Sequence, residues 1–139
     1  MRVLERDEME SFLDEQVYGR MGCHDAGLTY VVPLIYARDG DALYIMTTEG
    51  LKVRAARSQP AVCFEVDEHD RTTGNWRSVI VQGHYEELDA AGTAVALAAL
   101  GKRFGARSPT SKPAPEPARP TVAFRIVIAS MTGRAVERA

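Results

Sequence analysis

Runs of apolar and β-branched residues recur along the whole chain, and short polar, glycine-containing segments separate them. Two runs, TYVVPLIYA (29–37) and ALYIMT (42–47), flank the polar segment RDGD (38–41), a spacing typical of a β-hairpin. Further runs of this kind lie at 17–24, 61–67, 76–88 and 121–129. Because no strand–helix–strand spacing repeats, the pattern indicates antiparallel pairing rather than a doubly wound sheet. We expect a mainly β fold of six antiparallel strands, and a small closed or partly closed barrel fits strands of this length.

Three short helices complete the pattern. Asp7, followed three residues later by Glu10, has the form of a capping box at the start of the first helix. The segment LKVRAARS (51–58) predicts a short basic helix, and Asp89 is expected to cap an alanine-rich helix that ends near Phe104. These helices connect or cover strands, and none has the length of a helical bundle element.

Proline and glycine mark irregular positions in this pattern. Pro33 lies inside an apolar run and cannot donate to a ladder, which indicates a sheet edge, a bulge or an open stretch of backbone. Gly83 interrupts a long strand and predicts a bulge or a close contact. Five of the seven prolines fall within 105–120, so we expect an extended linker or a flap there.

The length of the chain and its net charge limit the classes of function that it can have. A chain of 139 residues is expected to form one domain, 1–139. With 17 basic and 19 acidic residues the net charge is −2, which argues against a broad nucleic-acid surface. No apolar run approaches the length of a membrane span, and the charged segment MRVLERDEME does not have the form of a signal peptide. We therefore expect a cytoplasmic protein with neither nucleic-acid nor membrane partners.

The cysteines and histidines, which are the residue types that most often bind transition metals, are scattered along the sequence. Cys23 and Cys63 lie forty residues apart, and His24, His69 and His84 show no ligand spacing, so we expect no metal site. The sequence also lacks the nucleophile, dinucleotide and P-loop motifs that contain glycine at fixed spacing. Neither metal chemistry nor a hydrolase mechanism is therefore indicated.

One junction has the composition of an anion site. Thr47 and Thr48 come at the end of a predicted strand, Gly50 follows, and Lys52 lies in the first turn of the next predicted helix. Hydroxyls, helix N-terminal amides and an ammonium group together bind phosphate well. The junction therefore predicts a phosphate-binding site.

Five segments occur in an order that resembles the pyridoxamine 5′-phosphate oxidase-like family, and more narrowly its branch that includes the bacterial nitroimidazole-resistance proteins. The resemblance covers most of residues 5–135. The segments are YVVPLIY, DGDALYIMTTEGLKVRAAR, PAVCFEVDE, WRSVIVQGHYEEL and FRIVIASMTGR.

This resemblance implies a split β-barrel homodimer with flavin mononucleotide (FMN) at the subunit interface. The strand from Val32 to Tyr36 would lie along the flavin ring, and the predicted anion site would hold the flavin phosphate. Ser78 and Val79 lie on a second strand that approaches the ring, and Trp76 could stack near it. By this likeness the cofactor-binding residues are Val32, Pro33, Leu34, Ile35, Tyr36, Met46, Thr47, Thr48, Lys52, Trp76, Ser78 and Val79.

Two positions depart from the pattern of the family. Met46 stands where several relatives have a histidine that is associated with activity in the nitroimidazole-resistance proteins. Leu51 precedes the phosphate-binding lysine where the pyridoxamine phosphate oxidases proper have an arginine. The departures argue against both of those specific reactions.

The residues leave three hypotheses open. The first is an FMN-dependent oxidoreductase that passes electrons from a reduced nicotinamide to a small acceptor such as a nitro compound, a quinone or oxygen. The second is a non-catalytic module that holds flavin, deazaflavin or haem, and Arg54 and Arg57 leave room for a deazaflavin tail. The third is a dimeric scaffold without a cofactor.

Overall fold

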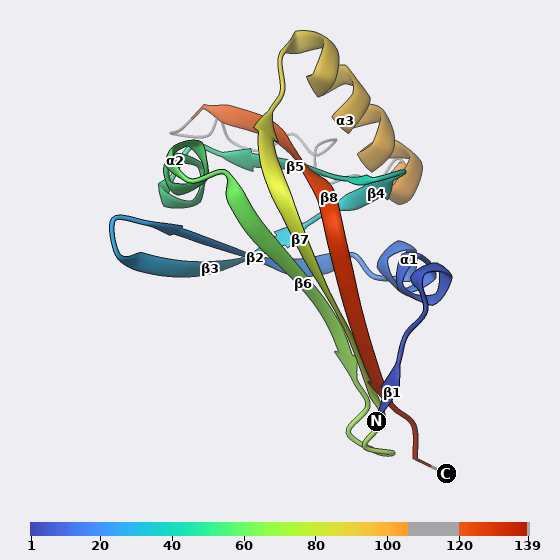
Figure 1. Cartoon of the computed structure of the whole chain (residues 1–139). Coiled ribbons are helices and arrows are strands. Elements are labelled where there is room, and N and C mark those ends of the chain that lie inside the picture. Colours follow the sequence, from blue (N-terminus) through green and yellow to red (C-terminus); the bar gives the residue numbers. More distant parts are fainter. Residues whose placement is uncertain (106–119, 139) are drawn as a thin grey trace.

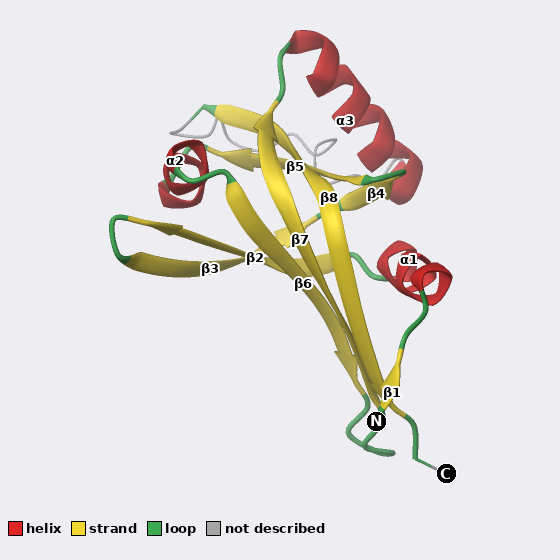
Figure 2. Ribbon diagram, viewed as in Figure 1, coloured by secondary structure: helices red, strands yellow, loops and turns green. Residues whose placement is uncertain are grey.

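The computed structural model describes residues 1–105 and 120–138, and residues 106–119 of the expected linker or flap lie outside this description. The described residues form eight strands and three helices, and Figure 2 shows how they are arranged. Their bounds are β1 Arg2–Val3, α1 Arg6–Glu15, β2 Tyr18–Asp25, β3 Leu28–Ile35, β4 Ala37–Asp39, β5 Ala42–Thr48, α2 Leu51–Ser58, β6 Ala61–His69, β7 Trp76–Glu87, α3 Ala90–Phe104 and β8 Thr121–Val136.

All strands belong to one antiparallel sheet that curls on itself (Figure 1). The order along the sheet is β3-β2-β6-β7-β8-β5-β4, and β1 pairs with the far end of β8. Only Tyr36 separates β3 from β4, so the strands at the two ends of this order follow one another directly in the chain. The sheet must therefore close toward itself at Tyr36, which gives the split β-barrel.

The six longer strands confirm the six predicted ones, and the two short strands β1 and β4 were not predicted. One predicted pairing is wrong. The run at 29–37 was expected to form a hairpin with 42–47, but β3 pairs with β2 through a two-residue turn at Ala26 and Gly27. Both turn residues have positive φ, the geometry that suits the twist of a tight hairpin. The hairpin partner of β5 is instead β4.

Pro33 and Gly83 occupy positions in the sheet that suit a residue without an N–H and a residue without a side chain, respectively. Pro33 is in β3, a strand at the end of the sheet order, so its missing N–H costs no ladder bond on the open side. The register between β7 and β8 shifts between Gln82 and Gly83, which confirms the bulge. A Cβ at Gly83 would lie 2.5 Å from Ile126 Cγ2 and 2.7 Å from the Val127 carbonyl oxygen. The close approach of β8 therefore demands glycine at this position.

The helices cover openings and outer faces of the barrel (Figure 1). α1 begins earlier than predicted, because Glu5 is its N-cap and the Glu5 N–H donates to the Glu8 carboxylate at 3.1 Å. The predicted box of Asp7 and Glu10 is thus wrong by two residues. Asp89 does cap α3, since its carboxylate accepts the Gly92 N–H at 2.8 Å. α3 packs on the outer side of β5, where Ala96 contacts the side chains of Ala42 and Tyr44.

Candidate functional site

The predicted phosphate site is assembled by the end of β5 and the start of α2. Thr47 and Thr48 are the last two residues of β5, and both are half-buried. Because side chains alternate along a strand, the two hydroxyls leave β5 on opposite faces. Lys52 lies in the first turn of α2 and is half-buried. Burial raises the pKa of the Cys23 thiol on β2, and the nearby Lys52 charge offsets only part of that rise.

The N-terminus of α2 has the polarity that an anion requires. Its N-cap is Gly50, so no side chain caps the first amides, and the first turn contains no acidic residue. The first four amides of a helix lack intrahelical partners and carry partial positive charge. The described residues at this junction therefore fit a phosphate group, with Lys52 as the charged contact.

The side chains of β3 divide between two faces of the sheet. Val32 and Leu34 turn inward onto the core, whereas Val31, which is 62% exposed, and Pro33 turn outward. Ile35 is half-buried. Only the outward residues and the backbone of this strand can lie against a flat ring on the outer face. β3 also lies against β5, so one copy of the chain brings the β3 and phosphate regions together.

Two predicted site residues are engaged elsewhere in the fold. Tyr36 is 1% exposed, packs edge-on against Phe64 and donates its hydroxyl proton to the Leu13 carbonyl oxygen at 2.5 Å. Burial raises the pKa of Tyr36, so the hydroxyl stays protonated and remains a donor. Met46 is half-buried and packs with Tyr44 against α3. Both side chains have a structural role.

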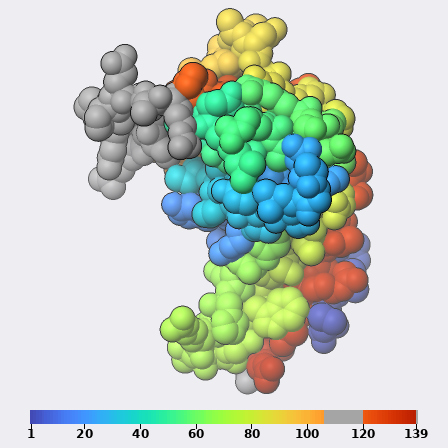
Figure 3. Space-filling model, turned by 90° about the vertical axis from the view of Figure 1, so that its left-hand side faces the viewer, coloured from blue at the N-terminus to red at the C-terminus, as the bar shows by residue number. Residues whose placement is uncertain are grey.

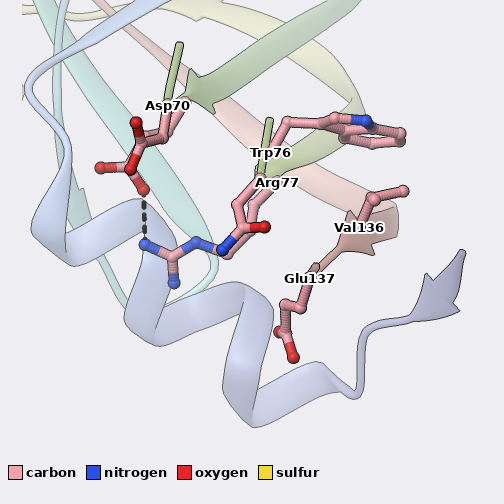
Figure 4. Close-up of a pocket in the computed structure, with 7 residues that line it drawn as sticks. Asp70, Trp76, Arg77, Val136 and Glu137 are labelled. Atoms are coloured by element: carbon pink, nitrogen blue, oxygen red, sulfur yellow. Dashed lines mark hydrogen bonds and ion pairs between the residues drawn. The ribbon is translucent and has the colours of Figure 1, made fainter. Parts of the chain in front are cut away.

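The remaining predicted residues lie at the start of β7. Trp76 and Ser78 point outward and are half-buried, whereas Val79 is 0% exposed and lies in the core. Trp76 contributes to a hollow of about 300 Å³. Figure 4 shows its ring beside Val136, with Arg77 extending away toward an acidic side chain. The residues that line the hollow are Glu68, Asp70, Asn75, Trp76, Arg77, Val136 and Glu137.

The surroundings of Trp76 and Ser78 are acidic. Arg20 bridges Glu65 at 3.3 Å and Asp67 at 3.1 Å on the adjoining strand β6. Burial, with the nearby Asp67 charge, raises the pKa of Glu65. Sequence reasoning missed this pair of carboxylates, although the alternation of AVCFEVD places both on the same face as Ser78.

Trp76 and the junction of β5 with α2 lie at opposite ends of β8 in one copy of the chain. Thr48 pairs with Thr121 at the start of β8, and Trp76 pairs with Val136 at its end. Those positions are fifteen residues apart, about 50 Å along the strand at ~3.3 Å per residue. In Figure 3 the yellow-green segment that joins β6 to β7 projects as part of a lobe below the body of the molecule. One chain therefore does not bring Trp76 to the phosphate region.

The histidines and the other metal-binding residue types do not cluster in the described part of the chain. No group of three or more His, Cys, Asp or Glu side chains in the described part of the chain could hold a metal ion. His24, His69 and His84 are exposed and lie on three different strands. No helix within residues 1–105 and 120–138 is both long and apolar enough to cross a membrane.

Comparison with known proteins gives a consistent family. A family model described as pyridoxamine 5′-phosphate oxidase matches residues 5–135. A FAD-binding protein from Mesorhizobium loti has a solved structure with a TM-score of 0.82 and 34% identity, and the match covers 98% of each chain. A provisionally assigned 5-nitroimidazole antibiotic resistance protein from Bacteroides thetaiotaomicron has a TM-score of 0.74 at 19% identity, covering 98% of this chain and 90% of that one.

A curated relative gives similar identity over a shorter stretch. Protein RA0666 of Rhizobium meliloti (strain 1021) is 33% identical over 90 residues, which is 65% of this chain. The match spans 59% of the length of that relative.

Proposed function

Since the chain belongs to the pyridoxamine 5′-phosphate oxidase family, we propose that it binds a flavin nucleotide at an interface between two copies of itself and acts as a flavin-dependent oxidoreductase. The observation that carries the proposal is the division of the expected cofactor contacts between opposite ends of β8. A second copy supplies the missing end. The similarity to a FAD-binding protein over 98% of the chain supports a flavin as the ligand.

The phosphate of the flavin is held by β5 and α2 of one copy. Lys52 would provide the charge, the α2 amides would donate hydrogen bonds, and whichever of the Thr47 and Thr48 hydroxyls lies on the same face would complete the group. The outward backbone of β3 beside Pro33 forms the adjoining wall. FMN, with its single terminal phosphate, matches this set of donors.

The partner copy contributes the outer face of β7. Trp76, Ser78 and Ile80 lie in one row on that face, and Ile80 is 40% exposed. Val31 on β3 and Ile80 on β7 are large apolar side chains that are exposed in one copy, and a partner copy on this face would cover them. An interface here brings an indole and a hydroxyl to the ring and excludes water from it.

A bound flavin supplies hydride and single-electron transfer, so the protein need not provide an acid–base pair. The residues of the chain bind the phosphate, orient the ring and shield it from solvent. The substrate class that fits is a small acceptor that reaches the ring beside Trp76, with a reduced nicotinamide as electron donor.

The test is a set of titrations of the purified protein with FMN, FAD, riboflavin, deazaflavin and haem, followed by absorbance after desalting. We expect FMN to be retained with a flavin spectrum and to be reduced by a nicotinamide under anaerobic conditions. FMN that is retained but not reduced would support a non-catalytic carrier. Tight haem binding without flavin binding would replace the proposal.

Lys52→Ala tests the phosphate contact itself. Loss of one charge-assisted contact is expected to weaken FMN binding by about 1.5–3 kcal/mol. Lys102→Ala is the matched control, because Lys102 is an exposed lysine in the last turn of α3. An unchanged FMN dissociation constant in Lys52→Ala would place the phosphate elsewhere.

A further inference from the structure

Arg57, in the last turn of α2, contacts both the end of β7 and the loop that precedes α2. Its Nε and Nη2 donate to the two oxygens of Glu87 at 2.7 and 3.0 Å, a two-pronged contact with the end of β7. Its Nη1 donates to Glu49 Oε1 at 2.6 Å. All three guanidinium nitrogens are therefore engaged with carboxylates, and both partners raise the pKa of Arg57.

Glu49 is an acidic residue that directly precedes the N-cap of α2. It lies between Thr48 and Gly50, on the loop that leads into α2. Its second oxygen, Oε2, is buried and has no hydrogen-bond partner among the described residues. A carboxylate here would repel a phosphate bound at the same loop, and Arg57 balances that charge.

Glu87 provides a fixed anchor for the other side of Arg57. The Tyr85 hydroxyl donates to Glu87 Oε1 at 2.8 Å, and the Tyr85 side chain is buried in β7. The bond from Arg57, together with this hydroxyl, lowers the pKa of Glu87 and keeps it ionised. The guanidinium is thus held at the sheet rather than free to swing toward a ligand.

We propose that Arg57 is a positioning residue for the phosphate site. It neutralises Glu49 and holds the end of α2 against β7, while Lys52 makes the contact with the anion. This inference rests on the proposed function. Arg57 as a direct phosphate ligand is the competing role, and it would require breaking bonds to two carboxylates.

Four variants separate these roles by their affinities for FMN and for riboflavin, which lacks the phosphate. They are Arg57→Gln, Glu49→Gln, the double variant, and Arg6→Gln as control. Arg6 lies on α1 and also contacts two carboxylates, Glu10 at 3.4 Å and Asp41 at 3.2 Å, away from α2. The affinities are measured by quenching of flavin fluorescence, with melting curves to show that each variant is folded.

A positioning role predicts a specific pattern. Arg57→Gln should lose about tenfold in FMN affinity, because an unbalanced carboxylate then faces the phosphate, and riboflavin affinity should stay within about twofold. Glu49→Gln should keep at least the wild-type FMN affinity. The double variant should recover most of the tenfold loss, and Arg6→Gln should match the wild type.

Several results would overturn the inference. The first is an FMN affinity of Arg57→Gln equal to that of the wild type, and the second is an equal loss of affinity for FMN and riboflavin. The third is a double variant that binds FMN no better than Arg57→Gln, and this third result would make Arg57 a direct ligand. In each of these cases a wild-type chain that binds FMN leaves the proposed function intact. A wild-type chain that binds neither flavin overturns the proposed function and this inference with it.

Discussion

Replacement of Tyr36 by phenylalanine removes one hydroxyl from the point where the barrel closes. The Tyr36 hydroxyl donates to the carbonyl of Leu13, which lies in the last turn of α1. The last four carbonyls of a helix have no intrahelical N–H partner, so this hydroxyl serves as a cap. With Tyr36 at 1% exposure, water cannot take its place without rearrangement.

The expected loss combines a hydrogen bond with an orphaned carbonyl. A buried acceptor left without a partner costs about 1–3 kcal/mol, and we expect about 1.5–2 kcal/mol for Tyr36→Phe. For a chain of 139 residues this corresponds to a fall in Tm of about 5–7 °C. Affinity for FMN should not change, because the side chain points into the core.

The assay is urea unfolding followed by fluorescence, together with an FMN titration of the folded variant. Tyr18→Phe is the control, because Tyr18 is 57% exposed and its hydroxyl faces solvent, so its effect should be under about 0.5 kcal/mol. Unchanged stability of Tyr36→Phe would refute the capping role. Weaker FMN binding without a loss of stability would indicate that Tyr36 contacts the cofactor, as the sequence predicted.

Three further outcomes test other parts of the account. Gly83→Ala should destabilise the fold by about 1–3 kcal/mol, because its Cβ would overlap Ile126 and the β8 backbone, and an unaffected urea midpoint would contradict that packing. Gly101→Ala should instead stabilise α3 by up to about 1 kcal/mol, since nothing lies within 4 Å of its Cβ, and a lower midpoint would count against the helix. The pKa of Glu87 is lowered by Arg57, so its contribution is complete above the ordinary carboxyl pKa of about 4.3 and is lost as pH falls through the folded value. Glu87→Gln should therefore lessen the loss of stability on acidification below that pH, and acid melting curves parallel to those of the wild type would contradict this.

The local sequence pattern was sufficient to predict strands where the buried side chains are large. The six long strands and the Asp89 cap follow from apolar alternation and from a single capping residue. The end of β8 was missed because its inward residues are small. Gly133 and Ala135 are buried, and Met9 and Leu4 occupy the space beside Gly133, so the strand continues to Val136 without an apolar run.

Which strands pair could not be predicted from the local sequence, because pairing depends on contacts between distant segments. The β2–β3 turn places Ala26 at positive φ, and an Ala-Gly pair does not signal a tight turn as Asn-Gly does. The structure places Thr47, Thr48 and Lys52 at one junction, as the sequence predicted, and their role in binding phosphate stays a prediction. The distance of Trp76 from them emerged only from the register of β8.

The most direct test of a cofactor site shared between copies is complementation. Chains carrying Lys52→Ala and chains carrying Trp76→Ala are each expected to retain little FMN after desalting. When the two are refolded together, random pairing should restore flavin to about a quarter of all sites, because half of the dimers are mixed and each mixed dimer has one intact site. A mixture that retains no more flavin than either variant alone, or a wild-type monomer that binds FMN, would contradict the account.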